Sequence, residues 1–180
     1  MSETLADAGS GEIVWSPARG RDGMGFLRTI NRGLLVTRDG GETWTSAFQA
    51  VPEAASLPVT AATVSPGFAD DGLVLAAIPG GIGRSQDCGE TWAFAALPGH
   101  LPLVTCLAIA PGETMPLLLA GTLEDGVARS DDGGATWTFW NGGLFDHEVI
   151  ALELHEGGVV AITPSGLYVS YNGGRAWRCP

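Results

Sequence analysis

Short apolar runs recur along the chain, separated by polar stretches rich in glycine and proline. Residues 12–15, 24–29 and 33–36 form a first series of such runs, and residues 60–64, 73–78 and 81–83 form a second. None of them continues with the 3.6-residue spacing of an amphipathic helix. Short apolar runs bounded by turn residues are typical of β-strands. The pattern therefore predicts an all-β protein.

The series returns twice more, at residues 104–110, 116–122 and 126–128 and at residues 149–154, 158–163 and 166–169. The third run of each series leads into an octet that ends in tryptophan. Its pattern is Ser or Thr, any residue, Asp or Asn, any residue, Gly, any residue, Thr or Ala, and Trp. The shared residues are Asp39, Gly41 and Trp44; Asp87, Gly89 and Trp92; Asp132, Gly134 and Trp137; and Asn172, Gly174 and Trp177.

The octet tryptophans are 48, 45 and 40 residues apart, and a period of about 40–50 residues is typical of one propeller blade. We therefore predict a β-propeller of four four-stranded antiparallel blades, with strands A to D in each blade and the octet as the turn between C and D. The single propeller domain spans residues 12–180, after a tail of residues 1–11 for which an extra edge strand is one option. The blades are expected at residues 12–50, 59–97, 103–141 and 148–180.

The octet resembles the Asp-box, or BNR repeat, of sialidases, sortilin-type receptors, bacterial glycoside hydrolases and photosystem II assembly factors. The resemblance covers residues 12–180, and the fourth octet departs from it at Asn172 and Ala176. It implies a structural role for the octet: glycine permits positive φ, the Asp carboxylate accepts backbone N–H groups, and tryptophan wedges between blades. The sialidase arginine triad is not found, and the only tyrosines, Tyr168 and Tyr171, lie beside or inside the fourth octet. The chain therefore resembles the non-catalytic type.

Charge narrows the classes of partner. The net charge is −11, and all nine basic residues are arginine. Repulsion by phosphate disfavours nucleic acid and anionic membranes, whereas a cationic partner or a metal ion stays open. No apolar stretch approaches the roughly 18 residues of a membrane span, and the N-terminus lacks signal-peptide features, which predicts a cytoplasmic protein. Cys88, Cys106 and Cys179 fit no metal motif; we expect reduced thiols, with a Cys88–Cys179 bridge left open.

Strand alternation divides the loops between two faces. The A–B loops and octet turns share one face, and the B–C and D–A loops share the other, where propellers commonly bind ligands. Asp146, His147 and Glu148 with Glu124 and Asp125 could hold calcium or another divalent cation, although a solvated loop is the simpler interpretation and no cofactor is expected. The candidate partner face comprises Asn31, Arg32, Glu53, His100, Glu124, Asp125, Asp146, His147 and Glu148, together with Trp140 on an outer strand.

These observations favour a non-catalytic binding scaffold, such as an assembly factor or accessory subunit with a protein partner. No Ser-His-Asp set has motif support, and the glycine pairs lead into strands rather than into a nucleotide-binding helix, so no catalytic residue is assigned. One alternative is a carbohydrate-binding protein, or a sialidase-like glycosidase if the chain is an enzyme at all. Another is half of an eight-bladed homodimeric propeller, which leaves monomer and homodimer both open.

Overall fold

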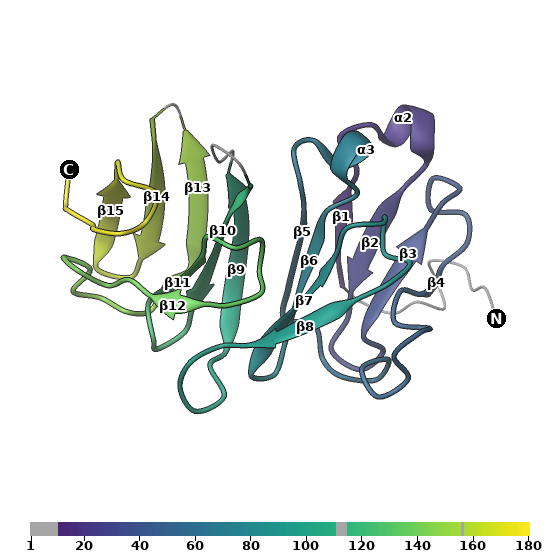
Figure 1. Ribbon diagram of the computed structural model, residues 1–180, viewed down its shortest axis with the longest axis horizontal. Coiled ribbons are helices and arrows are strands. Elements are labelled where there is room, and N and C mark those ends of the chain that lie inside the picture. Colours follow the sequence, from purple (N-terminus) through teal and green to yellow (C-terminus); the bar gives the residue numbers. More distant parts are fainter. Residues whose placement is uncertain (1–10, 111–114, 156) are drawn as a thin grey trace. The chain divides into compact units, whose positions relative to one another are not determined.

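The computed structural model describes residues 11–110, 115–155 and 157–180, which form four antiparallel sheets (Figure 1). Blade 1 contains β1 (Glu12–Trp15), β2 (Gly25–Arg28), β3 (Leu34–Thr37) and β4 (Thr45–Ser46). Blade 2 contains β5 (Ala61–Val64), β6 (Val74–Ile78), β7 (Gly81–Ser85) and β8 (Ala93–Ala96). Blade 3 contains β9 (Val104–Ala110), β10 (Leu117–Thr122), β11 (Val127–Ser130) and β12 (Thr138–Phe139), and blade 4 contains β13 (Ala151–His155), β14 (Gly158–Thr163) and β15 (Gly166–Ser170). The fold is all-β and is that of a β-propeller, as predicted.

The chain divides into two compact units. Unit 1 contains Gly83–Ala93 and the described residues up to Ile78, and unit 2 contains Pro79–Ile82 and the described residues from Phe94 onward. The boundary runs through β7 and β8, so unit 1 holds blade 1 with most of blade 2, and unit 2 holds blades 3 and 4. Each unit is described by itself below. The predicted tail lies, apart from Gly11, outside the described residues.

Blade 4 departs from the predicted four strands. In place of the predicted strand D, the structure has a single antiparallel bridge between Val169 and Arg178. In blades 1 and 3 the third residue after the octet tryptophan extends the pairing, because Ala47 N donates to Leu34 O and Trp140 N donates to Val127 O. The residue at that place in blade 4 is Pro180, which has no backbone N–H to donate. The outer strand therefore stops at the bridge.

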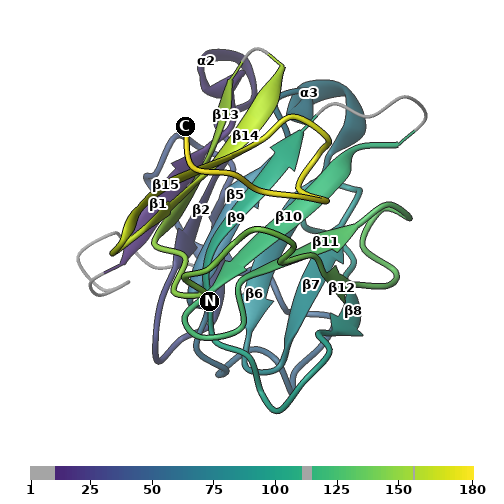
Figure 2. The same ribbon diagram turned by 90° about the vertical axis from the view of Figure 1, so that its left-hand side faces the viewer.

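Two A–B loops contain a short helical turn that the sequence pattern did not predict. These turns, α2 (Arg19–Asp22) and α3 (Phe68–Asp71), lie side by side at one end of the sheets of unit 1 (Figures 1 and 2). Ser16 Oγ donates to Asp22 Oδ2 at 2.6 Å, and Ser65 Oγ makes the equivalent bond to Asp71 at 2.6 Å. Each turn is thus closed by a serine and an aspartate six residues apart.

The same loops touch the octet turns. Gly40 N donates to Gly23 O at 2.9 Å in blade 1, and Cys88 N donates to Gly72 O at 3.0 Å in blade 2. A–B loops and octet turns therefore share one face, as strand alternation predicts.

The octet turns repeat one set of hydrogen bonds. In the first, Thr37 Oγ1 donates to Asp39 Oδ1 at 2.7 Å, Gly41 N donates to Thr37 Oγ1 at 2.9 Å, and Thr43 Oγ1 donates to Asp39 Oδ2 at 2.6 Å. The second and third octets make the same bonds. In the fourth, Asn172 Oδ1 accepts from Ser170 Oγ and Ala176 N. The bond that Thr43 Oγ1 makes in the first octet has no counterpart here, because Ala176 has no hydroxyl.

These bonds stabilise the ionised carboxylates. The hydroxyl and the backbone N–H of Thr43 hold the pKa of Asp39 far below its usual value. Partial burial alone would raise the pKa of Asp87, but bonds from Thr91 and Ser85 outweigh it and bring that pKa to about 2. Bonds from Thr136 likewise bring the pKa of Asp132 to about 2. The octet aspartates are therefore committed to their own turns.

Two of the octet tryptophans bond to the preceding blade. Trp92 Nε1 donates to Ala47 O at 2.9 Å in unit 1, and Trp177 Nε1 donates to Trp140 O at 2.9 Å in unit 2. Each thus has the predicted position between adjacent blades. Trp137 differs, because its buried Nε1 has no hydrogen-bond partner among the described residues.

Each unit has an apolar core between its blades. The core of unit 1 includes Phe26, Phe48, Phe68 and Val74. That of unit 2 includes Leu119, Val127, Tyr168 and Trp177. Tyr168 is buried within β15.

Cys88, Cys106 and Cys179 are free thiols in the described structure. Burial raises the pKa of the Cys106 and Cys88 thiols, which favours their protonated forms. In the described part of the chain, no helix has the length and apolar character that crossing a membrane requires.

Candidate functional site

The loops of unit 2 that lie opposite the octet turns form one connected surface. Leu123 N donates to Leu103 O at 2.9 Å, and Gly126 N donates to His147 O at 3.0 Å. Ser165 N donates to Asp146 Oδ2 at 3.0 Å. These bonds join two D–A loops to the B–C loops of blades 3 and 4. We call residues 97–103, 123–126, 141–150 and 163–166 the loop surface.

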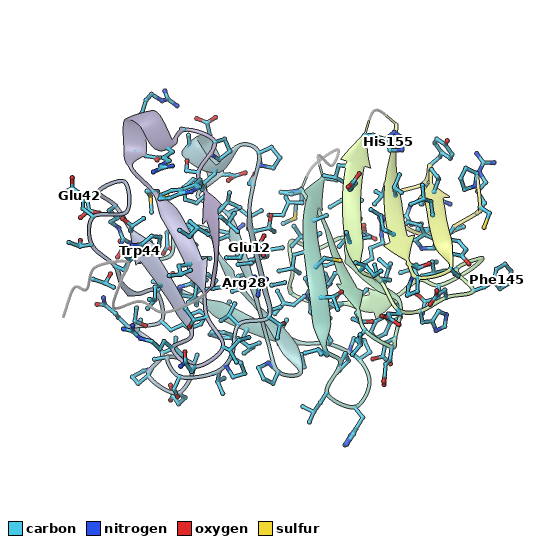
Figure 3. The ribbon with its side chains drawn as sticks, turned by 180° about the vertical axis from the view of Figure 1, so that it is seen from behind. Glu12, Arg28, Glu42, Trp44, Phe145 and His155 are labelled. Atoms are coloured by element: carbon cyan, nitrogen blue, oxygen red, sulfur yellow. The ribbon has the colours of Figure 1, made fainter. Side chains whose placement is uncertain are left out.

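Large apolar side chains are exposed on the loop surface. Their exposed fractions range from 38 % for Leu123 to 88 % for Phe145, and Figure 3 shows Phe145 projecting away from the ribbon. Single exposed apolar residues are ordinary, but several on joined loops commonly mark an interaction site. The set comprises Leu101, Leu103, Leu123, Phe145 and Ile150.

The charges of the loop surface all have one sign. Glu124, Asp125, Asp146 and Glu148 lie on it, and none of its residues is arginine or lysine. Asp146 accepts hydrogen bonds from the backbone N–H groups of Ser165 and Glu148, at 3.0 and 3.1 Å. The bonds from Ser165 are the main reason that the pKa of Asp146 is lowered. Asp146 therefore anchors the loops, whereas Glu124 and Glu148 are exposed.

Six of the residues selected from the sequence meet on the loop surface: His100, Glu124, Asp125, Asp146, His147 and Glu148. Trp140 borders it just after β12 and is 40 % exposed, while its backbone carbonyl accepts the Trp177 indole. Sequence reasoning selected polar residues and missed the exposed apolar set. The available signal was apolar residues inside turns, such as Leu101 between His100 and Pro102.

The other three selected residues, Asn31, Arg32 and Glu53, belong to unit 1. Asn31 and Glu53 are exposed, and the half-buried Arg32 donates its backbone N–H to Thr29 Oγ1 at 3.0 Å. Val59 N donates to Thr29 O, so this B–C loop is also bonded to a D–A loop. These residues form a separate set from the loop surface of unit 2.

Metal-ligating residues do not gather in the described parts of the chain. Among residues 11–110, 115–155 and 157–180, no three His, Cys, Asp or Glu side chains are grouped so as to hold a metal ion. In the loop considered for calcium, both oxygens of Asp146 already accept backbone N–H groups.

Unit 1 contains a hollow of about 350 Å³ beside its two helical turns. Its lining includes Arg21, Asp22, Met24, Phe68 and Cys88. Asp22 is already bonded to Ser16 Oγ and to Met24 N. Asp70 also lines the hollow, but no hydrogen bond joins it to Asp22 in the described structure, and we assign the hollow no chemistry.

No protein-family model matches the chain, and no curated protein sequence matches it. Solved structures do match. The GH74 xyloglucanase from Xanthomonas campestris has a TM-score of 0.71 and 21 % identity, covering 98 % of this chain and 31 % of that chain. YCF48 bound to D1 peptide has a TM-score of 0.64 and 18 % identity, covering 99 % and 55 %. The computationally designed Ika4 protein has a TM-score of 0.59 and 16 % identity, covering 88 % of each chain.

At these identities the likeness establishes the β-propeller fold and no activity. The chain spans about a third or less of the two GH74 enzymes it resembles, 24 % and 31 % of their chains, and 55 % of YCF48.

Proposed function

We propose that this chain is a non-catalytic β-propeller of the Asp-box type that binds a protein partner through the loop surface of unit 2. The observation that carries the proposal is the exposed apolar set on loops that hydrogen bonds already hold together. Burying apolar surface is favourable by about 25 cal/mol per Å², and pre-ordered loops lose little entropy on binding.

The Asp-box assignment rests on the octet contacts. Asp39, Asp87 and Asp132 each receive a threonine hydroxyl and a backbone N–H from the same turn. A carboxylate held ionised by its own turn is a poor general acid, because it has no proton to donate near neutral pH. The ionised octet carboxylates therefore favour a structural role for the octets. Such a role suits a protein that works as an assembly factor or accessory subunit.

A structural neighbour is consistent with partner binding. YCF48 was solved bound to D1 peptide, which makes peptide binding a reasonable activity to test on this chain. A cytoplasmic location stays a prediction.

The test is affinity capture with the tagged chain, followed by mass spectrometry. Leu123→Ser/Phe145→Ser removes two side chains of the loop surface. Met115→Ser/Leu154→Ser is the matched control, since those residues are 41 % and 39 % exposed elsewhere in unit 2. We expect one stoichiometric partner with the wild type and the control, and its loss with the first variant at unchanged melting temperature. Equal capture by all three proteins would overturn the proposal.

A second candidate function is glycan binding, which the exposed Trp140 indole and the likeness to a xyloglucanase favour. Calorimetric titration with xyloglucan oligosaccharides tests it. Binding that Trp140→Ala abolishes, together with failed capture of a protein, would place glycan binding first. Absence of binding at millimolar oligosaccharide would remove this candidate.

A further inference from the structure

We infer that the loop surface binds a cationic, amphipathic protein segment, whose apolar side chains cover the exposed leucines and Phe145 and whose arginines or lysines pair with Glu124 and Glu148. The inference rests on the proposed function and adds the chemistry of the partner.

The first observation is the distribution of ion pairs. Elsewhere in the described structure, some acidic side chains have arginine partners, such as Glu12 with Arg28 at 2.7 Å and Glu90 with Arg38. Asp131 likewise pairs with Arg129. Others, such as the exposed Glu42 and Asp70, have no arginine partner among the described residues. Glu124 and Glu148 have no such partner, since the described residues give neither carboxylate a hydrogen bond or an ion pair. The loop surface itself contains no arginine or lysine that could supply one.

The second observation is that these carboxylates lie on loops bonded to each other. Gly126 N donates to His147 O at 3.0 Å, which places the turn carrying Glu124 and Asp125 against the segment carrying Asp146 and Glu148. Like charges on adjoining loops repel one another, and a cationic partner relieves that repulsion. The surface is therefore electrostatically complementary to arginine and lysine.

The third observation is that acidic and apolar positions are adjacent in the chain. Glu124 follows Leu123, and Asp146 follows Phe145. A partner that covers both kinds of side chain must present apolar and cationic groups within one short segment. Nucleic acid and anionic lipid are disfavoured, because both carry negative charge toward a surface that is itself negative.

The probe is a set of three fluorescent 15-residue peptides that share five leucines at the same positions. The remaining polar positions are arginine in the first peptide, glutamine in the second and glutamate in the third. Fluorescence anisotropy with the full chain measures their affinities at 50 mM and 500 mM salt. We expect the arginine peptide to bind at least about tenfold more tightly than the glutamine peptide at low salt, and the advantage to shrink at high salt.

Matched variants separate local recognition from attraction to the whole acidic chain. Glu124→Gln/Glu148→Gln neutralises the loop surface. Glu42→Gln/Asp70→Asn removes the same charge from exposed positions in unit 1. We expect the first variant to lose most of the preference for the arginine peptide, and the second to keep it.

The outcomes distinguish the inference from the function on which it rests. Equal binding of the three peptides, or an arginine preference that both variants reduce alike, overturns the cationic partner. If Leu123→Ser/Phe145→Ser still abolishes binding in that case, the apolar surface and the proposed function stand. Failure of the arginine peptide to bind the wild-type chain also overturns the inference.

Discussion

The buried indole of Trp137 gives the sharpest test of how the blades are held. Trp137 and Trp177 occupy the same octet position, both belong to unit 2, and they are 5 % and 4 % exposed. Trp177 Nε1 donates to Trp140 O at 2.9 Å, whereas Trp137 Nε1 has no acceptor in the described structure. Replacing each with phenylalanine removes the N–H group and a similar amount of apolar surface.

The difference between the two variants isolates the hydrogen bond. Trp177→Phe loses a bond of about 0.5–1.5 kcal/mol and leaves the Trp140 carbonyl without its donor. Trp137→Phe removes an unpaired buried donor, whose burial costs about 1–3 kcal/mol in the native protein. The loss of packing is common to both. We therefore expect Trp177→Phe to be more destabilising than Trp137→Phe by about 1.5–4.5 kcal/mol.

Urea unfolding followed by far-ultraviolet circular dichroism measures both free energies of unfolding under the same conditions. Trp92→Phe is a further control, because Trp92 Nε1 donates to Ala47 O at 2.9 Å in unit 1. It should resemble Trp177→Phe apart from a smaller packing loss, since Trp92 is less buried. Equal destabilisation by Trp137→Phe and Trp177→Phe would refute the reasoning.

Three further predictions concern pH, the fourth octet and assembly. The pKa values of Asp87 and Asp132 fall from 3.8 to about 2 on folding, so their stabilisation is complete above about pH 4 and is lost toward pH 2. Thr136→Val should reduce the fall in melting temperature between pH 4 and 2, and an unchanged fall would contradict this. Asn172→Asp/Ala176→Thr should add the hydroxyl bond that the fourth octet lacks and raise the melting temperature by about 2–4 °C per kcal/mol gained. A lower melting temperature would show that the fourth octet turn cannot make the hydrogen bonds of the other three. Leu167 is 48 % exposed, and a second copy of the chain that covers it should make the melting temperature rise with protein concentration. Leu167→Glu should abolish that rise. Light scattering that shows only monomer would exclude the homodimer.

The sequence predicted most of the strands because the same pattern occurs four times. β1, β9 and β14 have the bounds predicted for residues 12–15, 104–110 and 158–163. The helical turns were not predictable from periodicity, since four residues are too few to show it. Their cause is a local bond between a serine and an aspartate, as in Ser16 and Asp22. The lost strand of blade 4 depends on one missing N–H, that of Pro180.

The site was only partly predictable for a different reason. Loop position follows from strand alternation, so polar residues such as Glu124 and Glu148 could be placed on one face. Whether an apolar loop residue is buried depends on the neighbours that the fold brings to it. Leu144 is buried and the adjacent Phe145 is 88 % exposed, although both lie in the same loop. Composition and spacing contain no signal for that difference.

Whether a carboxylate already has a hydrogen bond or an ion pair within the chain indicates where a partner would bind. On the face of the octets, aspartates accept bonds from threonine or serine hydroxyls of their own turns, and elsewhere several acidic side chains pair with arginine. Those bonds would have to be broken before such groups could bind anything else. On the loop surface, Glu124 and Glu148 have no such bonds to break in the described structure, and apolar side chains adjoin them. A partner can therefore gain both kinds of contact there without disturbing the fold. The residues with bonds already made are Asp22, Asp39, Asp71, Asp87, Asp131, Asp132, Glu12 and Glu90.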